Sequence, residues 1–203
     1  CLNVVLEYFL QKGPRSRALE LINDVCKKTG SIWWRVKRLK IYGHLELMSE
    51  NGLDHFNTEL DLLESEVSGW KWSEISRIQQ IIILEFKRHQ AFRHIRSGDY
   101  EYAQQKMDSV LQNFDDVPDR RTLEDDPQIG LARLHAIMIK ADAYFHTGQT
   151  PKAIHLLEPI VHIFHRAGWN YWTALTANKL GKYLNHVQKN EKGLEYLEMS
   201  LRL

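Results

Sequence analysis

The residues best placed for metal chemistry are histidines in the second half of the chain. His162 and His165 are three residues apart, so they share a face if the segment is helical, and His155 lies about two turns earlier, across Pro159. A zinc site needs three or four such ligands, with at least one more from a neighbouring element. No Cys pair and no His-Glu-x-x-His motif supplies that ligand. We therefore expect partly exposed helix histidines and no metal site.

Acid-base and nucleophilic chemistry also lack a site in the sequence. The carboxylate pairs, Asp115 with Asp116 and Asp125 with Asp126, lie in a polar stretch with no apolar surroundings to raise a pKa. The chain has no Gly-x-Ser-x-Gly motif and no glycine-rich loop to hold a phosphate. Turns and helix crossings account for the glycines that are present. The sequence therefore predicts no catalytic residues, no enzyme activity and no cofactor.

A recurring spacing of small and large residues indicates the elements that would position any binding site. Residues of matching size recur at offsets 0, +3, +7, +12, +16 and +19 in two segments. The first segment carries Ala141, Tyr144, Gly148, Ala153, Leu157 and Ile160, and the second carries Gly181, Leu184, Gln188, Gly193, Leu197 and Ser200. This spacing puts a small residue where two helices cross and larger ones where they lean together. Two such helices cannot bury their apolar faces alone, so neighbouring units must stack.

These residues resemble the pattern of tetratricopeptide repeats (TPRs). One copy covers residues 134–167, and the final copy supplies Leu180 with Gly181, then Gly193, Leu197 and Ser200. An earlier copy reads Ala91, Gly98, Asp99, Tyr100, Ala103, Met107 and Val110, and the end of a first copy reads Phe9, Gly13, Ala18, Ile22 and Val25. A degenerate copy between them has Tyr42 and Gly43, with a turn at Asn51 and Gly52. The resemblance implies an all-α, right-handed superhelical solenoid of antiparallel helix pairs. It has about five repeats, some degenerate, in a single domain over residues 1–203.

The repeats are longer than the standard one. The turn residues Gly13, Gly52, Gly98, Gly148 and Gln188 are separated by 39, 46, 50 and 40 residues, against about 34 in the standard repeat. Extended helices or inserted loops must therefore lie between units. Gly69 to Glu74 is one such insertion, where Ser73 can cap the next helix. Asp115 to Pro127, rich in Asp, Arg and Pro, predicts an exposed loop that can contact a partner.

The resemblance also indicates where a ligand would bind. In this family the first helix of each repeat lines a concave groove, and repeat positions 2, 5, 9 and 12 point into it. The matching residues are Lys37, Lys40, His44 and Leu47, then Glu85, Arg88, Phe92 and Ile95, then His135, Met138, Asp142 and Phe145, and finally Leu175, Asn178, Lys182 and Asn185. All of these except Leu47, Glu85 and Leu175 form the predicted partner-binding set. Its mixture of apolar side chains and cations suits an extended or helical peptide with acidic and apolar side chains.

One subclass of the family is tested directly by the sequence. Its chaperone adaptors grip a C-terminal carboxylate with Lys at position 5 and Asn at position 9 of the first repeat. The corresponding pairs here are Asn3 with Glu7, Lys40 with His44, Arg88 with Phe92, Met138 with Asp142, and Asn178 with Lys182. Because no copy pairs Lys with Asn, we do not expect recognition of chaperone tails.

The six tryptophans allow two interpretations. They come as three close pairs, each at or near the start of a first helix of a repeat: Trp33 and Trp34, Trp70 and Trp72, Trp169 and Trp172. They can fill the wide gaps between long repeats. Alternatively, one ring of each pair lines the concave surface as a binding anchor, since Trp is enriched among interface hot spots.

Composition limits the class of protein. With 43% hydrophobic and 26% charged residues, the 203-residue chain is typical of soluble globular proteins, and no apolar run is long enough to span a bilayer. Only Cys1 and Cys26 are present, which favours a reducing intracellular compartment, cytoplasmic or nuclear. The chain begins at Cys1 and stops inside an apolar helical pattern with no polar capping helix, so we expect a piece of a longer protein.

The net charge of +1 conceals two clusters of opposite sign. The basic cluster consists of Arg35, Lys37, Arg38 and Lys40, and the acidic one of Asp54, Glu59, Asp61, Glu64 and Glu66. We expect them on different faces.

The sequence as a whole predicts a non-catalytic scaffold or adaptor, a subunit of a larger complex, that binds a partner segment in the concave groove. One alternative is a peptide-sensing regulatory receptor, which would need an effector domain that these residues do not contain. Another is an RNA-binding helical repeat, which needs cations all along the groove, whereas Glu85 and Asp142 interrupt them. Neither nucleic acid nor membrane is the expected partner.

Overall fold

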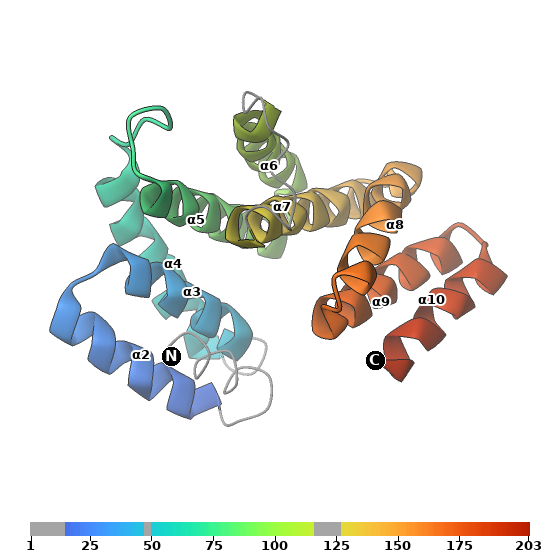
Figure 1. Ribbon diagram of the computed structural model, residues 1–203, viewed down its shortest axis with the longest axis horizontal. Coiled ribbons are helices and arrows are strands. Elements are labelled where there is room, and N and C mark those ends of the chain that lie inside the picture. The colour runs from blue at the N-terminus through green and yellow to red at the C-terminus, as the bar shows by residue number, and fades with distance from the viewer. Residues whose placement is uncertain (1–14, 47–49, 116–126) are drawn as a thin grey trace. The chain divides into compact units, whose positions relative to one another are not determined.

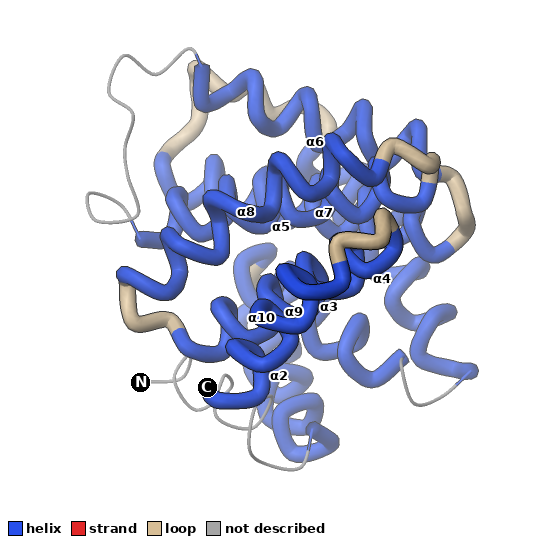
Figure 2. Tube along the Cα trace, turned by 90° about the vertical axis from the view of Figure 1, so that its right-hand side faces the viewer, coloured by secondary structure: helices blue, strands red, loops and turns tan. Residues whose placement is uncertain are grey.

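The computed structural model describes residues 15–46, 50–115 and 127–203, and these form helices joined by turns (Figure 1). The helices are α2 (Arg15–Thr29), α3 (Ile32–Glu46), α4 (Glu50–Val67), α5 (Arg77–Arg96), α6 (Tyr100–Asp115), α7 (Pro127–His146), α8 (Thr150–Arg166), α9 (Asn170–His186) and α10 (Asn190–Arg202). Figure 2 shows no strand in this part of the chain. The predicted all-α fold is confirmed. The predictions on Phe9, Gly13, Asp116, Asp125 and Asp126 fall outside the described residues.

The chain forms two compact units, residues 1–89 and 90–203, and the boundary lies inside α5. In the first unit α3 packs against both α2 and α4. In the second, each helix from α6 to α10 packs against the next one along the chain. Stacking of neighbouring helices is what the repeat pattern predicts, since each helix pair leaves an apolar face to cover. The expectation of a single domain over residues 1–203 stays a prediction.

Small residues lie where the helices of a repeat cross, as the offsets predict. Ala141 on α7 and Ala153 on α8 are both fully buried in the core of the second unit. In the next repeat a Cβ on Gly181 of α9 would lie 2.8 Å from the carbonyl oxygen of Gly193 on α10. The backbones of α9 and α10 therefore approach too closely for a larger side chain at Gly181.

The turns between paired helices have the same left-handed geometry with or without glycine. Gly98 and Gly148 have φ of 81° and 77°, and Gln188, where the family pattern has Gly, has φ of 61°. The N–H of Lys189 donates to the carbonyl of Leu184 at 3.0 Å and closes the end of α9. The predicted turn at Gln188 is thus confirmed, in a backbone region that costs a non-glycine residue about 1 to 2 kcal/mol.

Replacing Gln188 by glycine is therefore expected to stabilise the second unit by about 1 kcal/mol, because glycine adopts positive φ without steric strain. Thermal unfolding followed by circular dichroism measures the change. The reciprocal variant Gly148→Gln, at a turn of the same geometry, is the matched control and should lose a similar amount. A Gln188→Gly chain that melts below the wild type would contradict the assigned turn.

Two of the predicted boundaries are wrong. Asn51 and Gly52 lie in the first turn of α4 and not in a loop between helices. The helix α5 is capped by Ser76 and not by Ser73. The backbone N–H of Gln79 reaches the Ser76 hydroxyl at 3.4 Å, and the Gln79 side chain accepts from the Ser76 N–H at 3.0 Å. This reciprocal pair is a capping box, which satisfies two N–H groups at once.

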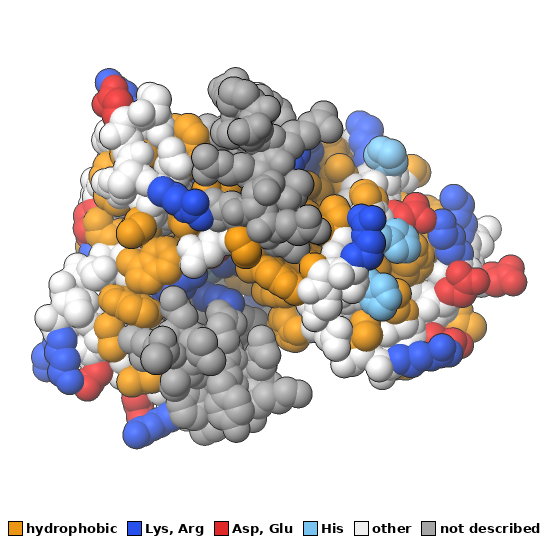
Figure 3. Space-filling view, viewed as in Figure 1, with side chains coloured by type: hydrophobic (Ala, Val, Ile, Leu, Met, Phe, Trp, Pro, Cys, Tyr) orange, Lys and Arg blue, Asp and Glu red, His pale blue; other side chains and the backbone are white. Residues whose placement is uncertain are grey.

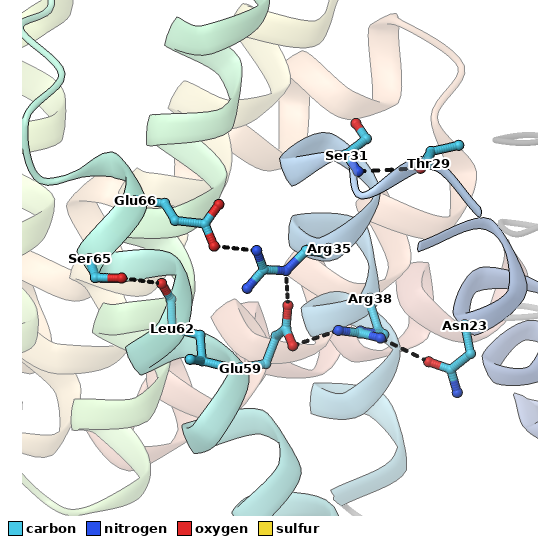
Figure 4. A network of polar contacts seen from close by, with 9 residues as sticks. All are labelled: Asn23, Thr29, Ser31, Arg35, Arg38, Glu59, Leu62, Ser65 and Glu66. Carbon is cyan, nitrogen blue, oxygen red and sulfur yellow. Dashed lines mark hydrogen bonds and ion pairs between the residues drawn. The ribbon is translucent and has the colours of Figure 1, made fainter. Parts of the chain in front are cut away.

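The two charge clusters of the first unit meet, and the prediction that they lie on different faces is wrong for four of their members. The carboxylate of Glu59 on α4 is 7% exposed and lies between two guanidinium groups of α3, at 2.7 Å from Arg35 and 2.5 Å from Arg38 (Figure 4). Arg35 also pairs with Glu66, and Arg38 bonds Asn23 of α2. A largely buried ionic network thus ties three helices together.

Among the described residues, no helix is both long enough and apolar enough to cross a membrane.

Candidate functional site

The predicted binding residues on α7 have side chains that contact α9. The ring of His135 lies 4.1 Å from that of Trp172, centroid to centroid, and His135 is 6% exposed. One turn further on, Met138 is buried with its sulfur 3.6 Å from the Thr176 hydroxyl. These two predicted site residues therefore hold neighbouring repeats together, and their side chains are not open to a ligand.

Asp142, the next residue of the set, is the centre of a polar cluster between the same two helices. Lys179 and the Tyr183 hydroxyl both reach its carboxylate, each at 2.5 Å. Burial of Tyr183, and next the charge of Asp142, raise the pKa of the Tyr183 phenol, so this group stays protonated and donates its hydrogen bond. The cluster fixes the register of α7 on α9 with charge-assisted bonds.

An aromatic cluster follows at the end of α7. Phe145 stacks on Tyr183 with ring centroids 4.0 Å apart and planes 10° from parallel, and His186 meets it edge-on at 5.2 Å. Phe145 is half-buried and His186 is exposed. Part of this apolar cluster is therefore exposed to solvent, beside the α9 residues described next.

The predicted residues of α9 are the more accessible part of the set. Lys182 and Asn185 are exposed, and Asn178 is half-buried on the same helix. Within the part of the chain that the structure describes, no donor reaches the Oδ1 atom of Asn178, although that atom is buried. One cation and two carboxamides thus follow one another along α9, at i, i+4 and i+7, beside the aromatic cluster.

The predicted residues on α3 and α5 are less open. In the first unit, Lys37 lies over the Trp33 ring at 4.6 Å, Lys40 is half-buried, and Arg88 pairs with Glu85 at 2.6 Å. The side chain of His44 is outside the described residues. In the second unit, Phe92 and Ile95 are half-buried. The charge of Arg88 is therefore largely offset by Glu85 on the same helix.

A buried histidine beside these cations was not predicted. His89 is 4% exposed, and its Nε2 lies 3.3 Å from the Arg88 guanidinium. Burial, and next the charge of Arg88, hold the pKa of His89 well below its usual range. His89 is thus a neutral core residue that packs edge-on against Phe56.

The residues of α9 that cover the α7 side chains were not predicted from the sequence. These are Trp172, Thr176, Lys179 and Tyr183, all on the side of α9 that faces α7. One signal was available: Asp142 and Lys179 are opposite charges on consecutive first helices. The predicted alternatives for tryptophan remain open, because Trp169 and Trp172 both stack near the core residue Phe164 while staying half-buried.

The three histidines considered as metal ligands are all exposed on α8. Among the described residues, no three His, Cys, Asp or Glu side chains gather in a way that could hold a metal ion. His162 instead lies 3.4 Å from the Tyr196 hydroxyl of α10.

The comparisons with known proteins show a similarity of fold and nothing more. No protein-family model matches the chain, and no curated protein matches it. Two solved structures of similar fold are a Podospora anserina protein named as a kinesin light chain with nearly identical TPR-like repeats, and a single-substitution variant of it. Their TM-scores are 0.57 and 0.59 at 16% sequence identity, and the alignments cover 99% of this chain and 92% of those chains.

Folds of this kind present extended surfaces. The predicted resemblance is confirmed at the level of the fold: the chain is an all-α helical repeat protein with a TPR-like fold.

Proposed function

We propose that the chain is a non-catalytic scaffold within a larger intracellular complex, and that it binds a segment of a partner protein along the first helices of its repeats. The observation that supports this most is a row of polar groups on α9, formed by the exposed Lys182 and Asn185 and the half-buried Asn178. We call this row the α9 face. It lies beside the aromatic cluster of Phe145, Tyr183 and His186.

The chemistry of the α9 face suits a peptide. A carboxamide carries both donors and an acceptor, so the exposed Asn185 can bond the N–H and C=O groups of an extended backbone. Lys182 would orient acidic side chains, and the aromatic cluster would contact apolar ones. The partner is thus a segment with acidic and apolar side chains.

The ion pairs of the predicted set favour a protein partner over RNA. Binding to RNA draws on many cations that are free to neutralise phosphates. Here Arg88 is paired with Glu85 on the same helix, and Asp142 puts a carboxylate within the set.

The test is capture from cell extract at physiological salt, with bound proteins identified by mass spectrometry and the affinity of the identified segment then measured. Lys182→Glu should weaken binding about tenfold and remove its salt dependence, because it reverses the charge that steers acidic residues. Asn185→Ala should also weaken binding. Both changes alter surface groups and should leave the melting temperature near that of the wild type.

The matched control is Lys189→Glu, a charge reversal at an exposed position in the turn that follows α9. It should bind like the wild type. If Lys182→Glu and Asn185→Ala bind the partner with wild-type affinity, the α9 face is not the binding surface and the proposal fails.

A further inference from the structure

A second surface of the second unit has the shape and charge of a docking groove. It lies between the first half of α7 and the second half of α8, has a volume of about 880 Å³, and ends at Trp169. Leu134 and Ile160 line it and are buried, at 7% and 2% exposure, whereas Arg166 and Ala167 line it from exposed positions. The groove therefore has an apolar floor and opens to solvent along one side.

The groove arises from the spacing of residues along two helices. On α7 it is lined by Gly130, Arg133, Leu134 and Ile137, which follow the i, i+3, i+4, i+7 pattern of one helix stripe, and α8 repeats this pattern from Leu156. Gly130 has no side chain to fill the space. The predicted binding set uses a different stripe of α7, which begins at His135 and packs on α9. The groove is thus separate from the α9 face.

The charged residue at the exposed rim of the groove is Arg166. Arg133 also lines the groove, and none of the described residues that line it is acidic. His162 and His165 line an adjoining hollow together with Arg166. Figure 3 shows histidine side chains among hydrophobic ones over the part of the view where α8 lies. Cations around an apolar floor are complementary to a ligand that carries both apolar and anionic groups.

We propose that this groove docks an amphipathic helical segment of a partner protein, with its apolar side chains on the floor and its acidic side chains toward Arg166. A small apolar ligand is usually enclosed on most of its surface, and this groove is open along one side. An amphipathic helix needs only one face buried and leaves its other face in water. The space between two packed helices also fits the ridges of a third.

The test is selection from a display library of random 16-residue peptides on the intact chain, followed by fluorescence anisotropy with the selected peptides. We expect peptides with apolar residues at i, i+3 or i+4, and i+7, and with Asp or Glu between them. Arg166→Glu should raise their Kd about tenfold or more. Ala167→Trp, which places a large ring on the exposed rim, should do the same by occupying the groove.

The charge-reversal control is Lys182→Glu on the α9 face, which should leave the Kd of these peptides unchanged. This variant also separates the two proposals. A peptide that no longer binds Lys182→Glu but still binds Arg166→Glu would support only the α9 face. Circular dichroism of each variant checks that the fold is kept. The docking proposal is overturned if no peptide is enriched, if the enriched peptides lack acidic residues, or if they bind Arg166→Glu and Ala167→Trp like the wild type.

Discussion

Replacing Glu59 with glutamine is expected to lower the free energy of unfolding of the first unit by about 3 kcal/mol. The isosteric change keeps the volume and removes the charge that compensates Arg35 and Arg38, whose side chains are 17% and 18% exposed. Glu66 can offset only Arg35, so Arg38 would be left largely buried without a carboxylate. Urea unfolding followed by tryptophan fluorescence measures the loss, since Trp33 and Trp34 lie on the same helix as both arginines.

Asp54→Asn on the same helix is the control, because this carboxylate is exposed, and it should change stability by less than about 0.5 kcal/mol. A double-mutant cycle with Arg38→Gln should give a coupling of about 1 to 3 kcal/mol, as expected for two groups in direct contact. A Glu59→Gln chain with the wild-type urea midpoint would show that the network does not hold α3 and α4 together.

Gly181→Leu is expected to destabilise the packing of α10 on α9 by about 3 kcal/mol. Even a Cβ at Gly181 would lie 2.7 Å from Leu197 Cγ and 2.8 Å from the Gly193 carbonyl oxygen. A backbone atom cannot move aside without shifting its helix, so the larger side chain must separate the pair. Hydrogen exchange of the α10 amides, together with the thermal melt, locates and measures the effect.

Gly181→Ala should cost less than Gly181→Leu, because alanine adds only the Cβ and gains up to about 1 kcal/mol in helix propensity. Lys182→Ala at the neighbouring exposed position is the control for the substitution of a helix residue and should melt like the wild type. Unchanged α10 protection in Gly181→Leu would refute the crossing at Gly181.

The repeat could be predicted from the sequence because its signals are local. Small residues at fixed offsets predicted the crossings at Ala141 with Ala153 and at Gly181 with Gly193, and the family pattern predicted the turn at Gln188. The Ser76 cap was also readable, since Gln79 three residues later completes a capping box. Ser73 has no such partner in the described structure.

Which residues of the predicted binding set are exposed could not be predicted from the sequence of each helix taken alone. Repeat position fixes the side of α7 on which Met138 and Asp142 lie. Whether that side is open depends on the side chains of α9, where Thr176 and Tyr183 cover it. The charge clusters of the first unit failed as a prediction for the same reason, because Arg35 and Glu59 meet only once α3 packs on α4. Long-range contacts between helices carry this information.

The central claim, that a partner segment binds along the first helices of the repeats, is tested most directly by site-specific photo-crosslinking. A benzophenone amino acid is placed at Asn185 on α9, and separately at Glu195, an exposed residue of α10, and each chain is irradiated in cell extract. We predict that Asn185 captures one acidic and apolar segment of a partner, identified by mass spectrometry, and that Lys182→Glu abolishes this capture. Capture of that segment from Glu195 and not from Asn185 would contradict the account.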